Sequence, residues 1–423
     1  MLRYMKFATV FVVLTATVAS ASSIFSYHPE GVGWWSFPST GRTAGMGGAT
    51  IAIYDEMNTI GVNPATNAGL DRTAMLATLL SQSRSVTDAA SRSASFHDQY
   101  PRVGRIVTPT WKGVVLSFGF EPMSDIVVKW SSRTAGPAGI TMIDSLEANG
   151  GLWSGSLGLA RAFGDFAFGV DWKLVRGNAQ TEWRRTIINA DTTTAPLATS
   201  TLLDREYTGG RASVGAVYRI GETSRRAATW VFGITAELPT SLDRQTTIST
   251  GTRIPSFYYP SHEDYYAVVD DLNDTTNATV NLPLSVGAGA SYRPSNQFLA
   301  AADITYTNWS ALSSAFADTW AASVGIEVHP TTSYRAFYPF QWPYRLGARM
   351  EEHYIRAGGA KPKAWYVSTG FGVPIGNGVG FIEYAFEYGQ RGSISKTLVR
   401  ERIWRHTISI VGWERWFQYR PRR

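Results

Sequence analysis

The chain of 423 residues contains no cysteine, so neither disulfide bridges nor thiolate zinc sites hold it together. After residue 21 it also has no apolar run of 18 residues, which excludes a transmembrane helix. The chain also lacks a strong excess of positive or negative charge, since its net charge is only +6. No segment combines clustered Lys and Arg with aromatic residues, as nucleic-acid-binding surfaces do. We therefore expect no nucleic-acid partner, and expect stability to come from a large core or a closed hydrogen-bonded sheet.

Catalytic and metal-binding patterns are lacking as well. The six histidines are scattered without an HExxH pair, and no G-x-S-x-G elbow occurs. GMGG at 45–48 has no hydrophobic strand before it and no helix after it, which excludes a nucleotide loop. Glu383 and Glu387 could suggest glycosidase carboxylates, but Arg345 and Arg349 occupy the same predicted face and favour ion pairing. The sequence predicts no enzyme, no catalytic residue, no metal site and no cofactor.

The first 21 residues have the layout of a secretory signal peptide. Arg3 and Lys6 give a positive start, residues 7–18 are apolar, and residues 19–21 supply a small-x-small cleavage site. The apolar run is too short for a membrane span. We therefore expect residues 1–21 to direct export and the mature chain to start near Ser22.

From about Thr73 onward the sequence alternates with period 2, which indicates β-strands. In FAFGVDWKL (166–174) Phe, Phe, Val, Trp and Leu share one face, whereas Gly, Asp and Lys share the other. About fourteen such segments are separated by turn signals, with 113–121 and 124–131 expected as two separate strands. An even number of strands is typical of bacterial outer-membrane barrels.

Alternation alone does not decide which face meets lipid, because a soluble β-sandwich alternates with its apolar face turned inward. Three features favour a membrane barrel. Charges of both signs recur on the polar face, Trp and Tyr recur at strand ends, and the edge strands are protected only if the sheet closes. The charges predicted to face the lumen are Lys129, Asp171, Lys173, Glu237, Asp303, Glu327, Arg345, Arg349, Glu383 and Glu387.

The lengths of the connections also alternate. Long connections near 85–112, 132–150, 179–203 and 246–278 are expected on one side as outer loops, and most tight turns fall on the other, periplasmic side. The connection 329–343 breaks this rule, because it is long but falls on the side of the tight turns. Either the strand count is wrong there, or an aromatic insertion is present on the periplasmic side.

Residues 41–70 are rich in Gly, Ala, Thr and Asn and contain few large apolar side chains, so they cannot form a core of their own. They fit a flexible linker, or a plug inside a wide lumen where larger residues would clash. Within them Pro64 fixes a local turn and Asn63 can bond neighbouring backbone groups.

Three passages of the chain resemble FadL-type outer-membrane transporters of hydrophobic compounds, a family that includes PorV-like relatives. The passages are residues 41–49 with the Asn-Pro-Ala box 63–65, Leu282-Pro283 with 299–303 and Trp309, and 370–374 with 387–392 and 414–417. Each motif is modest alone, but together they cover nearly the whole mature chain in the family's order.

The resemblance implies a transmembrane antiparallel β-barrel of about 14 strands over 73–417, followed by a basic tail at 418–423. Residues 22–72 are then a hatch inside the lumen. The hatch residues that it implies are Gly45, Gly47, Gly48, Asn63, Pro64 and Ala65. FadL-type proteins first capture substrate in an outer apolar groove, a role for which loop 254–269 offers Phe257, Tyr258, Tyr259, Tyr265 and Tyr266. The same rings could instead pack loop on loop or rest at the lipid headgroups.

The function that the resemblance implies is passive uptake of hydrophobic small molecules, such as long-chain fatty acids, gated by the hatch. The location is then the outer membrane of a Gram-negative-type bacterium, with the lipid bilayer and a hydrophobic ligand as partners. The alternative is a PorV-like shuttle that holds secreted proteins for a type IX secretion system. An inward kink that opens the wall to lipid would favour transport, and a plugged wall with large partner-binding loops would favour the shuttle.

Overall fold

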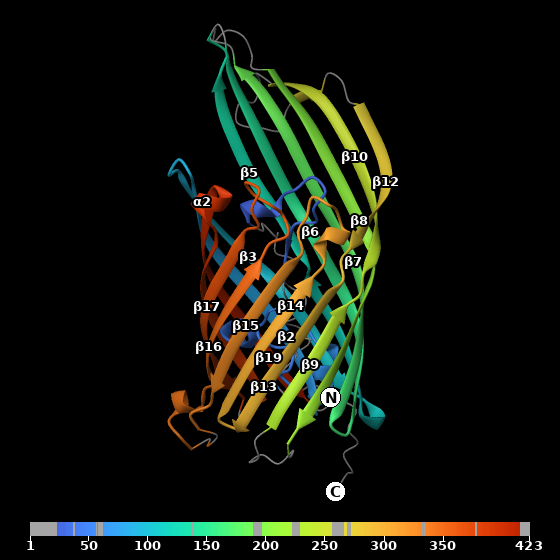
Figure 1. Cartoon of the computed structure of the whole chain (residues 1–423), viewed down its shortest axis with the longest axis vertical. Coiled ribbons are helices and arrows are strands. Elements are labelled where there is room, and N and C mark those ends of the chain that lie inside the picture. The colour runs from blue at the N-terminus through green and yellow to red at the C-terminus, as the bar shows by residue number, and fades with distance from the viewer. Residues whose placement is uncertain are drawn as a thin grey trace, which may run out of the picture.

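The computed structural model describes residues 23–36, 39–55, 57, 62–136, 139–188, 197–221, 229–255, 266–268, 272–331, 333, 335–376 and 379–414. They form a closed antiparallel β-barrel with the N-terminal segment inside it (Figure 1). The predicted signal peptide 1–21 and basic tail 418–423 lie outside the described residues. None of the described helices is long and apolar enough to cross a membrane.

The wall of the barrel has 14 crossings, and three of them are kinked, so that each consists of two strands. The kinked crossings are β4 (Val114–Pro122) with β5 (Ser124–Ala135), β9 (Thr229–Glu237) with β10 (Thr240–Pro255), and β12 (Leu272–Leu282) with β13 (Ser285–Ser295). The others are β2 (Thr73–Asp88), β3 (Ser93–Pro109), β6 (Thr141–Phe163), β7 (Phe166–Ile188), β8 (Leu197–Ile220), β14 (Phe298–Thr307), β15 (Thr319–Val328), β16 (Tyr344–Glu352), β17 (Lys363–Ile375), β18 (Gly380–Gly392) and β19 (Val399–Glu414). Antiparallel pairing of β19 with β2 joins the last crossing to the first and closes the barrel.

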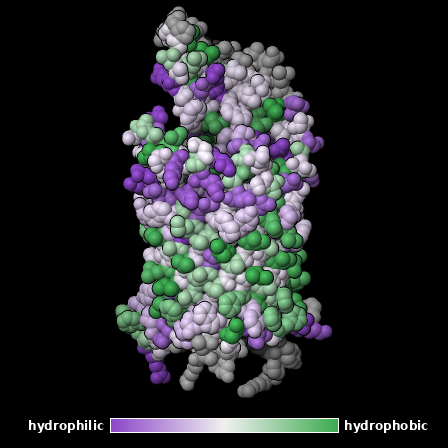
Figure 2. Space-filling view, in the orientation of Figure 1, coloured by the Kyte–Doolittle hydropathy of each residue, from purple (hydrophilic) through white to green (hydrophobic). Residues whose placement is uncertain are grey.

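The alternation of the strands separates a lipid-facing surface from a polar lumen. On β7, Phe168 and Trp172 are half exposed, whereas Asp171 and Lys173 between and beside them are buried. Such outward apolar side chains form a band across the lower and middle part of the face shown in Figure 2, below a polar upper part. The predicted membrane barrel is therefore confirmed, because an apolar face turned outward excludes the soluble sandwich.

The predicted strand number is correct, but two of its components are wrong. Segments 113–121 and 124–131 belong to one crossing that bends at Met123. The predicted connection 85–112 contains β3, which pairs with β2 along most of its length. β3 was missed because its outer half, SASFHDQYPR, has polar residues on both faces, and Pro101 sits where the register of the pairing shifts.

Strands β6, β7, β8, β10 and β12 continue far above the apolar band and form a raised wall on one side of the barrel (Figure 1). β7 and β8 remain paired from the tight-turn side up to Ile187 and Leu197. Much of the predicted outer loops 132–150, 179–203 and 246–278 is therefore strand. The tight turn at 164–165 lies at the opposite end, together with the start of β2 and the end of β19, which is the periplasmic end by the topology of bacterial barrels.

The hatch runs through the lumen as a series of short elements, drawn in blue inside the barrel in Figure 1. They are η2 (Ile24–Ser26), β1 (Trp34–Trp35), α1 (Gly41–Gly45) and η3 (Pro64–Gly69). The wall carries the remaining short elements in its connections: η4 (Trp111–Gly113), β11 (Tyr266–Val268), η6 (Trp309–Ala311), η7 (Tyr338–Gln341) and α2 (Ile394–Thr397). Because most described residues of the hatch are buried, it fills the lumen as a core would.

The largest apolar cluster lies at the outer end of the lumen, against the foot of the raised wall. Val32 of the hatch meets Val128, Leu152 and Leu242 of the wall there, with Tyr354 from the connection that follows β16. The Tyr354 hydroxyl donates to Gly33 O at 2.6 Å. The outer end of the barrel is therefore closed by a packed apolar layer.

Candidate functional site

The wall of the barrel is interrupted between β3 and β5. Pairing of β3 with β4 ends at Gly104 opposite Phe120, just before the bend of the third crossing. Beyond the bend, β5 pairs with β6 along one edge. At its other edge, within the part of the chain that the structure describes, β5 pairs only with β1 of the hatch, where Trp34 lies opposite Asp125. The hatch thus takes the place that β3 would hold in a regular barrel.

Two glycines allow β6 to follow the bend of its neighbour. Gly150 and Gly151 have φ angles of 126° and 148°, a backbone conformation that residues other than glycine rarely adopt. A Cβ atom on Gly151 would overlap the carbonyl oxygen of Ser124, and one on Gly150 would overlap that of Asn178. The interruption of the wall is therefore built into the sequence of β6.

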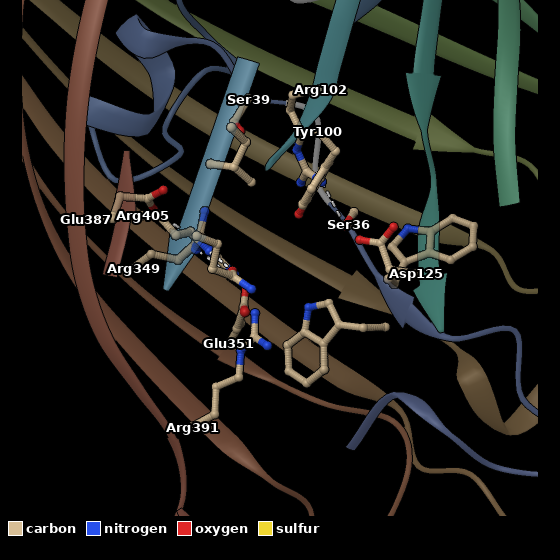
Figure 3. A pocket seen from close by; sticks show the side chains of 14 residues that line it. Ser36, Ser39, Tyr100, Arg102, Asp125, Arg349, Glu351, Glu387, Arg391 and Arg405 are labelled. Carbon is tan, nitrogen blue, oxygen red and sulfur yellow. Dashed lines mark hydrogen bonds and ion pairs between the residues drawn. The ribbon is translucent and has the colours of Figure 1, made fainter. Parts of the chain in front are cut away.

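A charged cavity, which we call the arginine cavity, lies behind the interruption (Figure 3). Tyr100 and Arg102 of β3 lie at one side of the interruption and Asp125 of β5 at the other. The charged residues that line the cavity are Arg102, Arg349, Arg391, Arg405, Asp125, Glu351 and Glu387. Four guanidinium groups thus face three carboxylates.

The ion pairs of the arginine cavity leave its guanidinium groups partly engaged. Arg349 lies 3.3 Å from Glu351 and 3.4 Å from Glu387. Arg391 reaches Glu401 at 3.6 Å. These separations exceed the 2.7–2.9 Å of strong charge-assisted hydrogen bonds. An anion that enters the cavity would therefore compete with long ion pairs at Arg349 and Arg391.

An aromatic ring orients three of the arginines. The guanidinium carbons of Arg349, Arg391 and Arg405 lie 4.6, 5.9 and 4.8 Å from the centroid of the Tyr366 ring. Nε of Arg391 also donates to the Tyr366 hydroxyl at 2.6 Å, and its guanidinium lies 3.9 Å from the Trp34 ring centroid. Cation–π contacts of this kind hold cations close together at reduced electrostatic cost.

A second space, which we call the hatch cavity, lies between the hatch and the wall. It shares Trp35, Ser36, Ser39 and Arg349 with the arginine cavity, so the two spaces adjoin. Its lining mixes small and apolar groups with a cluster in which Lys173 lies 2.8 Å from Glu121 and 3.0 Å from Glu237. The two spaces thus lie next to each other, between the interruption and the lumen.

Ion pairs attach the hatch to the wall beneath these cavities. Arg42 of α1 contacts Asp55 within the hatch at 2.7 Å and Glu327 of β15 at 2.9 Å. Arg345 of β16 lies 2.7 Å from Glu327 and 3.1 Å from Glu383 of β18. Because breaking a buried charge pair is strongly unfavourable, this network holds α1 in the lumen.

The predicted glycine segment contacts the wall at very short range. Gly47 has a φ of 68°, and a Cβ atom there would clash with the backbone of Ala348. Gly45 and Gly48 lie against the side chains of Arg345 and Arg349. Glycine is required at position 47 both by its backbone conformation and by the distance to the strand.

The predicted Asn-Pro-Ala box starts η3 and ties two parts of the hatch together. The Asn63 side chain accepts a hydrogen bond from Ala65 N at 3.1 Å and donates to Ile51 O at 2.9 Å. Pro64 and Ala65 lie against Gly169 of β7, where a Cβ atom would meet their backbone. The box therefore rests on a point of the wall that lacks a side chain.

The outer end of the hatch is held by His353, which follows β16. Its Nε2 donates to Phe25 O at 2.9 Å, and its ring stacks on Trp34 with centroids 4.0 Å apart. Burial lowers the pKa of His353 to about 3, and the nearby positive charge of Arg391 acts in the same direction. His353 is therefore neutral while it holds the hatch.

Nine of the ten charges predicted for the lumen have side chains that are buried or mostly buried. Besides the pairs above, Asp303 accepts hydrogen bonds from Thr50 N and, at 2.8 Å, from Ile51 N of the hatch. Asp171 lies 3.4 Å from Arg105. The nine are Asp171, Lys173, Glu237, Asp303, Glu327, Arg345, Arg349, Glu383 and Glu387.

The prediction for Lys129 was wrong. Its side chain is 76% exposed and pairs with Glu147 on the neighbouring strand at 3.5 Å. On β5 the inward positions are those of Ile126 and Val128, which belong to the apolar cluster at the outer end of the lumen. Lys129 occupies an odd-numbered position of β5 and therefore points away from the lumen. Its predicted inward orientation was wrong because the bend at Met123 was not recognised.

Of the charges that line the arginine cavity, sequence reasoning found Arg349 and Glu387 but missed the other five. Arg391 continues the inward series of Glu383 and Glu387 on β18, and extending that alternation by four residues would have found it. Arg102 and Asp125 flank the interruption, which no alternation pattern reveals.

The remaining predictions concern an outer loop and a metal site. Phe257, Tyr258, Tyr259 and Tyr265 lie outside the described residues, and Tyr266 begins β11, which pairs with the end of β10. Capture of a ligand by these rings stays a prediction. Among the described residues, no group of three or more His, Asp or Glu side chains is arranged to hold a metal ion.

Comparison with family models gives a match to BamG over residues 1–421. No curated protein matches the chain at the level of sequence.

Solved structures share the architecture over nearly the whole chain. The P. putida toluene transporter TodX aligns with a TM-score of 0.62 and 13% identity, over 91% of this chain and 99% of TodX. A Pseudomonas aeruginosa FadL homologue aligns with a TM-score of 0.59 and 12% identity, over 91% and 100%. The CymD monoaromatic hydrocarbon channel gives 0.56 and 14%, over 90% and 98%. At these identities the likeness establishes a common fold and confirms the FadL-type architecture expected from the sequence.

Proposed function

The chain belongs to the BamG family, and from this premise we propose that it is an outer-membrane barrel that binds amphipathic small molecules with an acidic head group. The molecule would enter from the bilayer through the interruption between β3 and β5. Its head group would bind in the arginine cavity, and its apolar part would occupy the hatch cavity or the interruption. A long-chain fatty acid has this chemistry. The similar folds of TodX and CymD, which are described as channels for hydrocarbons, support a small-molecule role.

The observation that carries this proposal is the position of the arginine cavity directly behind the interrupted wall. Carboxylates and phosphates bind guanidinium groups through two parallel hydrogen bonds. Trp34, Trp35 and Leu80 line the same cavity and offer apolar surface next to the charges. Each methylene that such a surface removes from water contributes about 0.8 kcal/mol. The lining therefore fits an amphipath better than a plain hydrocarbon.

The proposal assigns the movement to β1 rather than to the whole hatch. α1 is attached to the wall by Arg42 and Glu327, and η3 is enclosed by the Asn63 contacts. β1 is attached to β5 by two opposite residue pairs, and its movement would also have to release the stacking of Trp34 on His353 and Arg391. Displacing β1 would connect the cavity with the interruption and leave the ion pairs of α1 intact.

Binding of oleate and of oleyl alcohol to the protein in lipid nanodiscs tests the proposal, because the two ligands differ only in the head group. We expect oleate to bind more tightly, and expect Arg405→Gln to weaken oleate binding by about tenfold, or about 1.4 kcal/mol, with little effect on the alcohol. Arg185→Gln is the control, because Arg185 lies on the raised wall and pairs with Asp144. Equal binding of the two ligands, or equal effects of the two substitutions, would exclude the acidic-head site. A shift in gel mobility on boiling verifies that each variant is folded.

A second candidate function, a shuttle for secreted proteins, is favoured by the raised wall, which presents paired strands far above the apolar band. Photo-crosslinking from exposed wall positions such as Gln245 in intact cells tests it. A single crosslinked protein partner would support the shuttle, and crosslinks to lipopolysaccharide alone would argue against it.

A further inference from the structure

The long connection between β15 and β16 lies at the periplasmic end, where the connections at 164–165 and 296–297 are tight turns. It contains η7 (Tyr338–Gln341), preceded by Phe337 and followed by Trp342. We call residues 337–342 the aromatic knob. It appears in orange at the lower left of Figure 1, just before the start of β16. Neither the family assignment nor the proposed binding site accounts for it.

The aromatic knob has a defined structure. Phe340 N donates to Phe337 O at 2.8 Å, and Gln341 Nε2 donates to Ala336 O at 2.8 Å. The Tyr338 hydroxyl donates to Pro374 O at 2.7 Å, which attaches the knob to the end of β17. The knob therefore presents its side chains in a fixed arrangement.

Contacts with the barrel place the knob on the lipid-facing side of the wall. Trp342 stacks on Phe371 of β17, with ring centroids 5.4 Å apart and planes within 17°. Phe371 has the same parity as Trp365 and Val367, which belong to the outward apolar band. The Tyr344 hydroxyl on the outward face of β16 donates to Pro339 O at 2.9 Å. The knob thus folds over the outer surface of β16 and β17 and does not lie beneath the lumen.

The outermost side chains of the knob are apolar and largely uncovered. Phe337 is 71% exposed and Phe340 is 57% exposed, and their rings meet edge to face at 5.9 Å. Phenylalanine has no polar group that would benefit from water, so exposure of two neighbouring rings is unfavourable unless something covers them. Arg335, two residues before Phe337, is exposed as well.

We propose that the aromatic knob is a membrane anchor that inserts Phe337 and Phe340 into the periplasmic leaflet of the bilayer. The partner is phospholipid, because the knob continues an interface with lipid that the barrel already has. From Tyr338 the aromatic surface passes through Trp342 to Phe371, and from there to Tyr384 of β18 at 5.4 Å. Arg335 lies where its guanidinium can reach the phosphates at the level of the headgroups.

The absence of cysteine makes the anchor directly measurable. A single cysteine at Phe340→Cys carries an environment-sensitive fluorophore, and the protein is placed in phosphatidylcholine nanodiscs with or without lipids that carry a quencher on the acyl chain. Leu346→Cys on the lipid face of β16 is the positive control. Asp165→Cys in the exposed tight turn at the same end of the barrel is the negative control.

We expect the label at position 340 to show blue-shifted emission and quenching by the acyl-chain quencher, as at position 346, while the label at 165 shows neither. If the label at 340 behaves like that at 165, the knob faces water and the anchor is overturned, which would leave a periplasmic protein as the partner to seek. Heat-dependent gel mobility confirms that each labelled variant is folded. The result is independent of ligand binding, so it stands or fails separately from the proposed function.

Discussion

The guanidinium of Arg42 in the hatch and the carboxylate of Glu327 in the wall form a bidentate ion pair, with Nε–Oε2 and Nη2–Oε1 distances of 2.9 Å each. Both side chains are 3% exposed. The two residues are 285 positions apart in the sequence. They meet only when the hatch is seated in a closed barrel, so the pair reports on the complete fold.

Removal of one member of this pair is expected to destabilise the barrel. Arg42→Gln removes the cation that Glu327 and Asp55 share, which leaves Glu327 with Arg345 and Asp55 with Arg293. We therefore expect a loss toward the lower end of the range for broken buried pairs. Losses for such changes are about 3–5 kcal/mol. Urea unfolding of the protein in lipid vesicles, followed by tryptophan fluorescence, measures the difference. Arg185→Gln on the exposed wall removes an ion pair as well, and we expect it to change the unfolding free energy little, because exposed pairs contribute little. Similar losses for both variants would contradict the anchoring role of Arg42.

A substitution at Gly47 tests whether close approach to the wall seats the hatch. Gly47→Ala introduces a Cβ atom against the backbone of Ala348 and forces alanine to adopt a φ of 68°. Strain of this kind costs about 1–3 kcal/mol before the clash is counted. Gly155→Ala on β6 is the matched control, because a Cβ atom there meets nothing within 4 Å. Small-solute leakage from vesicles should increase for Gly47→Ala and not for Gly155→Ala. Leakage that is unchanged in both would show that the glycine segment tolerates displacement.

The state of His353 predicts a dependence of stability on pH. Its pKa is about 3 in the folded protein and about 6.5 in an unfolded chain. Between these values the unfolded chain binds a proton that the folded protein does not, so stability falls as the pH decreases from about 6.5 toward 3. At about pH 5 the expected loss is about 2 kcal/mol relative to neutral pH. Amide hydrogen exchange of residues 23–36 should accordingly be faster at the acidic pH than at neutral pH, after correction for the intrinsic exchange rate.

The matched variant for this prediction is His353→Gln. Its amide can still donate to Phe25 O but does not titrate, so the part of the pH dependence that comes from His353 should disappear. Buried carboxylates also contribute to acid sensitivity, and the comparison with the parent protein removes their share. If the variant and the parent lose protection in parallel between about pH 6.5 and 5, the assignment to His353 is wrong.

Much of the fold could be predicted from the sequence because lipid and lumen impose a strict period of two on each crossing. On β7 this pattern separates Trp172 from Asp171 without ambiguity. β3 escaped prediction because the outer part of that strand borders the hatch and the interruption, so neither of its faces is consistently apolar. Its Pro101 is compatible with a strand only because the pairing shifts register there.

The candidate site could be predicted only in part. Arg349 and Glu387 were assigned to the lumen from alternation, but their meeting at 3.4 Å depends on the order in which β16, β17 and β18 pair. Arg102 of β3 and Asp125 of β5 line the same cavity because β1, and not β3, pairs with the edge of β5. No local pattern encodes that exchange of partners, since it results from competition between the hatch and β3 for one strand edge.

That exchange of partners can be tested with an engineered disulfide. Trp35 of β1 lies directly opposite Ser124 of β5, and opposite residues of antiparallel strands are spaced closely enough for a disulfide bond. In the double variant Trp35→Cys with Ser124→Cys, oxidation would bond β1 covalently to the wall. We expect oleate binding in nanodiscs to be lost after oxidation and to return after reduction, because the proposed route requires β1 to move. The single variants, which cannot form the bond, should bind oleate equally under both conditions. Undiminished binding by the oxidised double variant would mean that a ligand reaches the arginine cavity without displacing β1.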